Sequence, residues 1–319
     1  MKKFLFMTAA LLLSQGASAQ TLKQGKLDNV TRITSDAAKY ENPRWSPDGS
    51  KIAFTGFGYD GLYIMDADGL SKKQISDASG VGYMFQWSAD SREILVRDTR
   101  WEETADGVRR YHAAWAVDLS GDKVRLTEDA EYMQPAAWRY SVSGAKSIAA
   151  PDARIISGSA LSVLPKSVSR QVALNPSTNI SFIVDSDNLY IVNSRGDKKL
   201  INEGASFCPV LSPDGKKVAF NQMDDVCVMN IDGTGKKVLG RGFNPSWVND
   251  SQIIYELTTD DGHTYTSGEL YIINIDGTGY KPLTTTSRLI EMNPCVSPDG
   301  SKVVFTSFTD GQIYVADLK

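Results

Sequence analysis

The chain has 319 residues, of which 41% are hydrophobic and 23% are charged, and its formal net charge is −4. This composition is typical of a fully globular protein. The acidic balance argues against nucleic-acid binding, which needs a concentration of Lys and Arg on one surface. Past the N-terminal stretch, no segment approaches the about 18 consecutive apolar residues of a membrane-spanning helix. We therefore expect no membrane insertion of the mature chain.

The first 19 residues have the pattern of a secretory signal peptide. Lys2 and Lys3 precede an apolar stretch at 4–13, and Ala17-Ser18-Ala19 matches an Ala-x-Ala cleavage box. Cleavage after Ala19 would remove the two lysines and lower the net charge from −4 to −6. We expect a periplasmic or secreted protein whose single domain spans 20–319.

A repeated phrase organises the rest of the chain. Trp-Ser-Pro-Asp-Gly stands at 45–49, and Ser-Pro-Asp-Gly recurs at 212–215 and 297–300, each time before a short apolar run. Self-similarity at a period of about 20 to 50 residues, with Asp-Gly turns between β-branched runs, predicts the four-stranded blades of an all-β β-propeller. One anchor residue marks each unit: Trp45, Trp87, Trp138, Leu174, Leu211, Trp247 and Val296.

These anchors favour seven blades. The count falls to six if the third and fourth units merge, because 141–166 has few charges and no Asp-Gly turn. The last unit ends after its third strand, at 312–317, and a strand at 29–34 could complete it. Such pairing of the two ends would close the ring and leave no exposed sheet edges.

Three segments resemble TolB-type propeller repeats: 46–54, 270–279 and 313–318. Related repeats occur in dipeptidyl-peptidase-like and tricorn-like propellers. The resemblance extends from about residue 27 to 319 and implies a WD40-like propeller fold. TolB proteins also carry a small α/β domain before the propeller, for which there is no room after Gln20. Propeller peptidases carry a hydrolase domain with a Gly-x-Ser-x-Gly motif, which this sequence lacks. We expect a propeller standing alone.

The repeated aspartates and the cysteines favour structural roles. In Pro-Asp-Gly and Asp-Gly-Thr-Gly turns, Asp bonds nearby backbone groups and Gly supplies a positive φ, so we predict turn formation and no metal binding. These residues are Asp48, Asp214, Asp232, Asp276 and Asp299. The cysteines are odd in number, and we interpret them as small buried hydrophobic residues: Cys208, Cys227 and Cys295.

Two long insertions interrupt the repeat, at 97–112 in the second unit and 258–269 in the sixth. Both join the second and third strands, so both are expected as loops on the face opposite the tight turns. Long loops on a rigid scaffold tend to carry function, and Trp, Tyr and Arg are frequent in binding hot spots. We interpret the two histidines as solvated loop residues. The candidate partner-binding residues are Arg97, Arg100, Trp101, Arg109, Arg110, Tyr111, His112, Asp260, Asp261, His263 and Tyr265.

A second candidate site is the mouth of the central channel on that same face. Its aromatic residues could stack on a sugar or receive a peptide, and Glu41 with Glu291 could form an acid–base pair. The alternative is packing between blades for the aromatic residues and a solvated rim for the acids. The residues that precede the anchors here are Tyr40, Glu41, Tyr83, Glu131, Tyr132, Phe207, Phe243 and Glu291.

Two functions remain open from the sequence. The first is a non-catalytic protein-binding or scaffold module of the cell envelope, with a protein or peptide as partner and no cofactor. The alternative is a carbohydrate-active enzyme, a lyase or glycosidase, that uses residues at the channel mouth and binds a glycan.

Overall fold

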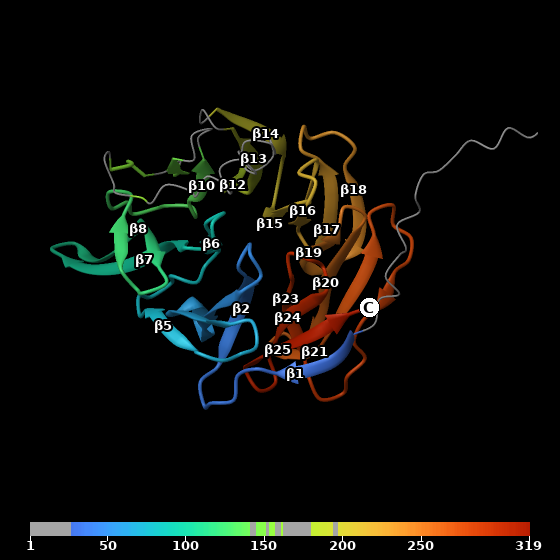
Figure 1. The fold of residues 1–319 in the computed structure, drawn as a ribbon. Helices are drawn as coiled ribbons and strands as arrows, with labels where there is room; N and C mark the ends of the chain where they lie inside the picture. The colour runs from blue at the N-terminus through green and yellow to red at the C-terminus, as the bar shows by residue number, and fades with distance from the viewer. Residues whose placement is uncertain (1–26, 141–144, 151–152, 157–160, 162–179, 194–196) are drawn as a thin grey trace, which may run out of the picture.

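The computed structural model describes residues 27–140, 145–150, 153–156, 161, 180–193 and 197–319, which form a ring of β-sheets around a central axis (Figure 1). The expected signal peptide and the anchor at Leu174 lie outside these residues. Apart from the short 3-10 helix η1 (Phe57–Tyr59), the elements are β-strands. In the part of the chain that the structure describes, no helix has the length and apolarity to cross a membrane.

Four blades are antiparallel sheets of consecutive strands, as the Asp-Gly turns and short apolar runs predict. The first has β2 (Tyr40–Trp45), β3 (Lys51–Gly56), β4 (Leu62–Asp66) and β5 (Lys73–Ser76); the second has β6 (Gln86–Trp87), β7 (Glu93–Thr104), β8 (Gly107–Asp118) and β9 (Lys123–Arg125). The other two have β15 (Ser206–Leu211), β16 (Lys217–Gln222), β17 (Asp225–Asn230) and β18 (Lys237–Arg241), and β19 (Phe243–Asn249), β20 (Gln252–Asp260), β21 (Tyr265–Asn274) and β22 (Lys281–Pro282).

The fifth four-stranded sheet joins the two ends of the described chain, and we call it the closing blade. Its order is β1-β25-β24-β23. The expected pairing of the chain ends is therefore confirmed, although the N-terminal strand starts two residues earlier than expected. The bounds are β1 (Leu27–Arg32), β23 (Glu291–Val296), β24 (Lys302–Ser307) and β25 (Gln312–Leu318).

Between β9 and β15 the described sheets are incomplete. A two-stranded sheet, β10 (Ala137–Tyr140) with β11 (Lys146–Ala149), is followed by a three-stranded sheet. The Oγ of Ser181 donates to the carbonyl oxygen of Trp138 at 2.5 Å and ties the two together. The two-stranded and three-stranded sheets together occupy one blade position, so the ring has six blades. The propeller is confirmed, whereas the favoured count of seven is wrong, because an anchor residue marks a strand and not a complete sheet. The three strands are β12 (Ser181–Asp185), β13 (Asn188–Val192) and β14 (Lys198–Asn202).

Three anchor tryptophans, Trp87, Trp138 and Trp247, each donate a hydrogen bond to the sheet before their own. The indole Nε1 of Trp87 donates to the carbonyl oxygen of Arg44 at 3.2 Å, and Trp247 donates to Val210 at 2.9 Å in the same way. The apolar core also lies between blades: Phe54 of the first blade and Ile313 of the closing blade belong to one buried cluster. Burial of each such side chain stabilises the fold by about 1.5–3 kcal/mol.

The Ser-Pro-Asp-Gly phrase forms tight turns, as predicted. The Oγ of Ser46 donates to the Oδ1 of Asp48 at 2.6 Å, and the same oxygen accepts the backbone N–H of Ser50 at 3.0 Å. Gly49 has a φ of 72°, in the left-handed region that glycine adopts without steric cost. Asp232 likewise accepts the N–H of Thr234 at 2.9 Å.

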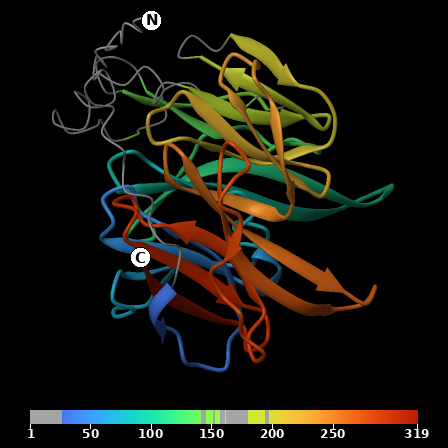
Figure 2. The same ribbon diagram turned by 90° about the vertical axis from the view of Figure 1, so that its right-hand side faces the viewer.

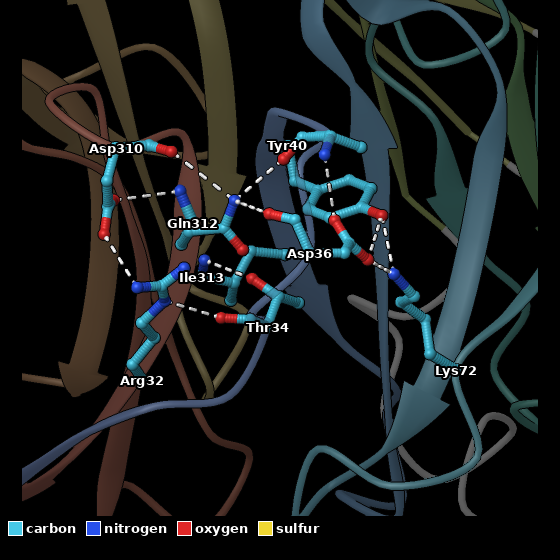
Figure 3. Close-up of polar contacts among 9 residues, drawn as sticks. Arg32, Thr34, Asp36, Tyr40, Lys72, Asp310, Gln312 and Ile313 are labelled. Atoms are coloured by element: carbon cyan, nitrogen blue, oxygen red, sulfur yellow. Dashed lines mark hydrogen bonds and ion pairs between the residues drawn. The ribbon is translucent and has the colours of Figure 1, made fainter.

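The segment after β1 fastens the closing blade to the first blade (Figure 3). The backbone N–H of Ile33 donates to Ile313, and the N–H of Ile313 donates to the Oγ1 of Thr34 at 2.9 Å. The Nε2 of Gln312 donates to backbone oxygens of this segment, that of Ala38 at 2.7 Å among them. Far ends of the chain thus meet in one hydrogen-bonded unit.

The three cysteines are free thiols in different environments. Cys227 is fully buried in an apolar cluster, as expected. Cys208 and Cys295 are only partly buried, which corrects the expectation for them.

Candidate functional site

The two insertions form β-hairpins and not loops. Strands β7 and β8 remain paired to their ends, from Glu93↔Asp118 to Thr104↔Gly107. Strands β20 and β21 extend from Gln252↔Asn274 to Asp260↔Tyr265. The first segment contains two Thr and one each of Val, Trp and Tyr, and the second contains four Thr and one Tyr, all residue types that favour extended pairing. The expectation of loops is therefore wrong. Figure 2 shows the two hairpins projecting toward the same side of the ring.

The outer part of the β7–β8 hairpin carries an aromatic and basic surface. Trp101 is 60% exposed, and the guanidinium of Arg110 lies 5.8 Å from its ring centroid. Arg100 pairs with Glu102 and Asp129, each at 2.8 Å. These exposed pairs hold the arginines in place but add little stability.

Arg109 and Tyr111 extend that surface toward the acidic segment before β10. Arg109 pairs with Glu131 at 2.8 Å, so Glu131 belongs to the hairpin surface rather than to the channel mouth. Tyr111 faces the guanidinium of Arg100 at 5.3 Å. Tyr132, next to Glu131, is 59% exposed.

The root of this hairpin is buried. The N–H of His112 donates to the carbonyl oxygen of Ala130, and its Nδ1 lies 3.1 Å from the Oγ1 of Thr99. Burial, with the nearby charge of Arg97, lowers the pKa of His112. The expectation of a solvated His112 is therefore wrong. His263 is exposed, as expected, at the tip of the other hairpin, where Asp261 accepts its N–H at 2.9 Å.

The centre of the ring contains a cavity of about 640 Å³ that opens on the hairpin side. Its mouth carries Tyr83, Phe207 and Phe243, three residues predicted to lie there. From the β20–β21 hairpin come Asp260 and Tyr265, so the two candidate sites meet in one surface. The remaining lining residues are Asn42, Arg44, Tyr59, Met84, Cys208, Asp224, Arg241, Asn244, Glu256, Thr258, Met292 and Asn293.

A repeated β-bulge shapes the cavity wall. Three residues before an anchor, the inner strand adopts a positive φ, and the pairing register shifts at the same place, as between Phe243 and Ser246. A non-glycine residue in this conformation is uncommon, and Asn tolerates it best. The bulge re-aims the neighbouring side chains toward the channel. The left-handed residues on these strands are Asn42, Cys208, Asn244 and Asn293, and Met84 has the same conformation just before β6.

Polar side chains on the second strands of the blades accept hydrogen bonds from backbone N–H groups at these bulges. The Oδ1 of Asn221 accepts the N–H of Asn244 in the next blade at 3.1 Å. The carboxylate of Glu256 does the same for the N–H of Asn293, and its other oxygen accepts the Nδ2 of Asn244 at 3.0 Å. Glu256 is 2% exposed, and burial raises its pKa to about 7 despite these hydrogen bonds and the charge of Arg44.

A smaller cavity of about 310 Å³ adjoins the central one, sharing Tyr59 and Tyr265 with it. Glu41 lines it and accepts the N–H of Tyr59 at 2.8 Å. Burial and the charge of Glu41 raise the pKa of Tyr59 to about 12. Tyr265 packs edge-on against Phe308, with 5.2 Å between ring centroids. The result is an aromatic recess beside the channel mouth.

Besides Glu131, two further predicted mouth residues do not line the central cavity. Tyr40 also borders the smaller cavity but is 4% exposed and packs edge-on against Phe54 at 5.1 Å, so it belongs mainly to the core. Glu291 is 1% exposed and accepts the Oγ1 of Thr286 at 2.8 Å, in the gap toward the β19–β22 blade. An acid–base pair needs both carboxyl groups to face one substrate, and Glu41 with Glu291 does not meet that requirement.

The sequence reasoning missed Arg44, Glu256 and the left-handed residues. A signal for them exists: the inner strands read Asn-Pro before the anchor at 42–43, 244–245 and 293–294. A polar residue also follows the aromatic position of the second strand, as Glu256 follows Tyr255. Among the described residues, no group of three or more His, Cys, Asp or Glu side chains could hold a metal ion.

Known proteins resemble this chain in sequence and in fold, although no family model matches it. A TolB homologue from Chlorobium luteolum is 29% identical over 35% of this chain and 27% of its own length. The Tol-Pal system protein TolB from Alcanivorax borkumensis is 32% identical over 22% of this chain and 17% of its own length. The chain thus matches about a quarter, or less, of these relatives.

A solved structure described as a TolB from Agrobacterium tumefaciens superposes on 91% of this chain and 97% of its own, with a TM-score of 0.55 and 15% identity. At that identity the likeness shows the fold alone. These matches confirm the expected resemblance to TolB-type propellers.

Proposed function

We propose that this chain is an exported, non-catalytic, TolB-like protein of the cell envelope that binds a protein or peptide partner at the hairpin side of its ring. The observation that carries this proposal is the 640 Å³ central cavity, whose mouth is aromatic and whose wall carries both signs of charge. Concave sites with apolar rings and a few placed polar groups are typical of binding pockets. The N-terminal pattern of a signal peptide supports export.

The surface has the residue types of a binding hot spot, set on rigid elements. Tyr59 and Tyr265 flank the cavity, and Trp101 stands on the β7–β8 hairpin. Aromatic residues with apolar bodies and polar edges recur at interface centres. The carboxyls of Glu41 and Glu291 do not face a common cavity, which favours binding over glycoside cleavage.

The test is cross-linking of the protein in intact envelopes, identification of the captured protein by mass spectrometry, and titration of that protein in purified form. The double variant Tyr59→Ala/Phe243→Ala should weaken its binding by about tenfold or more, as expected for a hot spot. The control is Tyr280→Ala, an exposed tyrosine (53%) after the β21–β22 turn on the opposite face. Unchanged binding in the double variant, or turnover of an oligosaccharide on a glycan array, would overturn the proposal.

A further inference from the structure

A row of buried polar side chains crosses the closing blade near its hairpin-side end. Glu291 on β23 pairs with Ser307 on β24, and Ser307 pairs with Gln312 on β25. Residues directly opposite in antiparallel strands project to the same face, with Cβ atoms about 4.5–5.5 Å apart. The three residues are 1%, 0% and 2% exposed. The blade therefore presents a line of oxygen atoms in a place without water contact.

Each residue of this row keeps an oxygen without a hydrogen bond among the described residues: the Oε2 of Glu291, the Oγ of Ser307 and the Oε1 of Gln312. The orientation of Gln312 is fixed, because its Nε2 donates to backbone oxygens of Asp36, Ala38 and Asp310 (Figure 3). A flipped amide would place its oxygen against those carbonyl oxygens. Buried polar atoms are nearly always paired, so unpaired oxygens in one row need an explanation.

The facing blade adds a second carboxylate. Glu269 on β21 accepts the backbone N–H of Thr286 at 2.9 Å, and the Oγ1 of Thr286 donates to Glu291 at 2.8 Å. Both carboxylates therefore converge on one residue, and the Oε2 of Glu269 is also buried and unpaired among the described atoms. Burial, with the charge of Glu269, raises the pKa of Glu291 to about 7. Within the described chain, neither carboxylate forms an ion pair with Lys or Arg.

We propose that Glu269, Glu291 and Ser307 bind a calcium-like divalent cation between the β19–β22 blade and the closing blade. Two carboxylates balance a double positive charge, and a hydroxyl adds a neutral oxygen ligand. Ca²⁺ accepts such all-oxygen sets in flexible geometry, whereas Zn²⁺ prefers His and Cys ligands. The Oε1 of Gln312 lies at the far end of the row and supplies a further oxygen.

Such an ion would brace the hairpin beside the cavity. Glu269 lies four residues after Tyr265 on the same strand, and Tyr265 lines both cavities. A cation held by β21 and β23 would fix the root of that hairpin relative to the closing blade. The inference does not depend on the identity of any partner, so it stands or falls separately from the proposed function.

The test uses the full chain after dialysis against EDTA, with CaCl₂ added and MgCl₂ as a comparison. The native protein should bind one Ca²⁺ in calorimetric titration and unfold at a higher temperature, since ligands of the folded state stabilise it. Glu291→Gln and Glu269→Gln should both lose this response. Glu269 is only partly buried, so its variant keeps the test valid if Glu291→Gln does not fold.

Glu256→Gln is the matched control, because Glu256 is equally buried with a raised pKa, but both its oxygens accept hydrogen bonds. It should keep the calcium response. An absent response in the native protein, or an unchanged response in Glu269→Gln and Glu291→Gln, would overturn the proposal. A melting temperature that varies with pH but not with CaCl₂ would assign the unpaired oxygens to a bound proton instead.

Discussion

The carboxylate of Glu256 accepts the backbone N–H of Asn293, which lies on the inner strand of the next blade. Asn293 has a φ of 54°, and this bulge turns its N–H away from its own ladder. A buried N–H without an acceptor costs about 1–3 kcal/mol, so a polar residue is needed on the neighbouring strand. Asn221 serves Asn244 in the same way. The channel wall is polar because its bulges require acceptors.

A pH dependence of stability follows from Glu256. Its pKa is about 7 in the folded protein and near 4.5 in an unfolded chain. At pH values between these two, the carboxyl group of Glu256 is protonated in the folded state but ionised in the unfolded chain. The stabilisation is fully present below about pH 4.5 and is lost as the pH rises through 7. The difference between these two pKa values is equivalent to about 3 kcal/mol of folding stability.

Urea unfolding at pH 5 and pH 8, in EDTA, measures this contribution. The native protein should lose more stability between these values than Glu256→Gln does, and titrations common to both proteins cancel in the comparison. The variant should also be less stable at pH 5 by about 1–3 kcal/mol, because its amide nitrogen cannot accept the second hydrogen bond. Equal pH dependence in the two proteins would show that Glu256 keeps an ordinary pKa.

Trp101→Ala should separate recognition from packing on the β7–β8 hairpin. The ring is 60% exposed and has a cation–π contact with Arg110, so the free energy of unfolding should change by no more than about 1 kcal/mol. Capture of the envelope partner should weaken. Leu70→Ala, an exposed residue (65%) in the β4–β5 turn, is the control. A large fall in melting temperature with unaltered capture would make the hairpin a packing element.

The propeller was predictable because the turn phrase and its anchors are local patterns that recur in the chain. The number of blades was not predictable. The anchors Trp138 and Leu174 each mark one strand, and the sequence does not say how many further strands belong to the same sheet. The aromatic mouth was found because Tyr83, Phe207 and Phe243 share a position before their anchors. Glu256 was missed because it stands within an apolar strand, and its acceptor role depends on Asn293, 37 positions later. The polar residue after Tyr255 and the Asn-Pro pair at 293–294 had to be considered together to reveal this pairing.

Thr34→Val should loosen the ring closure. The Oγ1 of Thr34 accepts the N–H of Ile313 at 2.9 Å, and Thr34 is 4% exposed. Valine has a similar shape but leaves that N–H buried without a partner, which should lower the free energy of unfolding by about 1–3 kcal/mol. Thr34→Ser retains the hydroxyl and should lose less. Equal stability of the Val and Ser variants in urea unfolding would show that this bond does not fasten the ring.

Lys146→Met tests the buried ion triad that fastens the incomplete β10–β11 sheet to the second blade. The Nζ of Lys146 lies 2.9 Å from Asp90 and 2.7 Å from Glu93, and its side chain is 0% exposed. Removal of the ammonium leaves two largely buried carboxylates without this counter-charge, and loss of one partner of a buried pair costs about 3–5 kcal/mol.

The triple variant Lys146→Met/Asp90→Asn/Glu93→Gln removes all three charges and should recover part of that loss. The measurement is urea unfolding of the three proteins under the same conditions. If the single and triple variants are equally destabilised, loss of packing around the lysine stem, and not the uncompensated charge, explains the effect. If the single variant is as stable as the native protein, the triad does not hold this sheet to its neighbour.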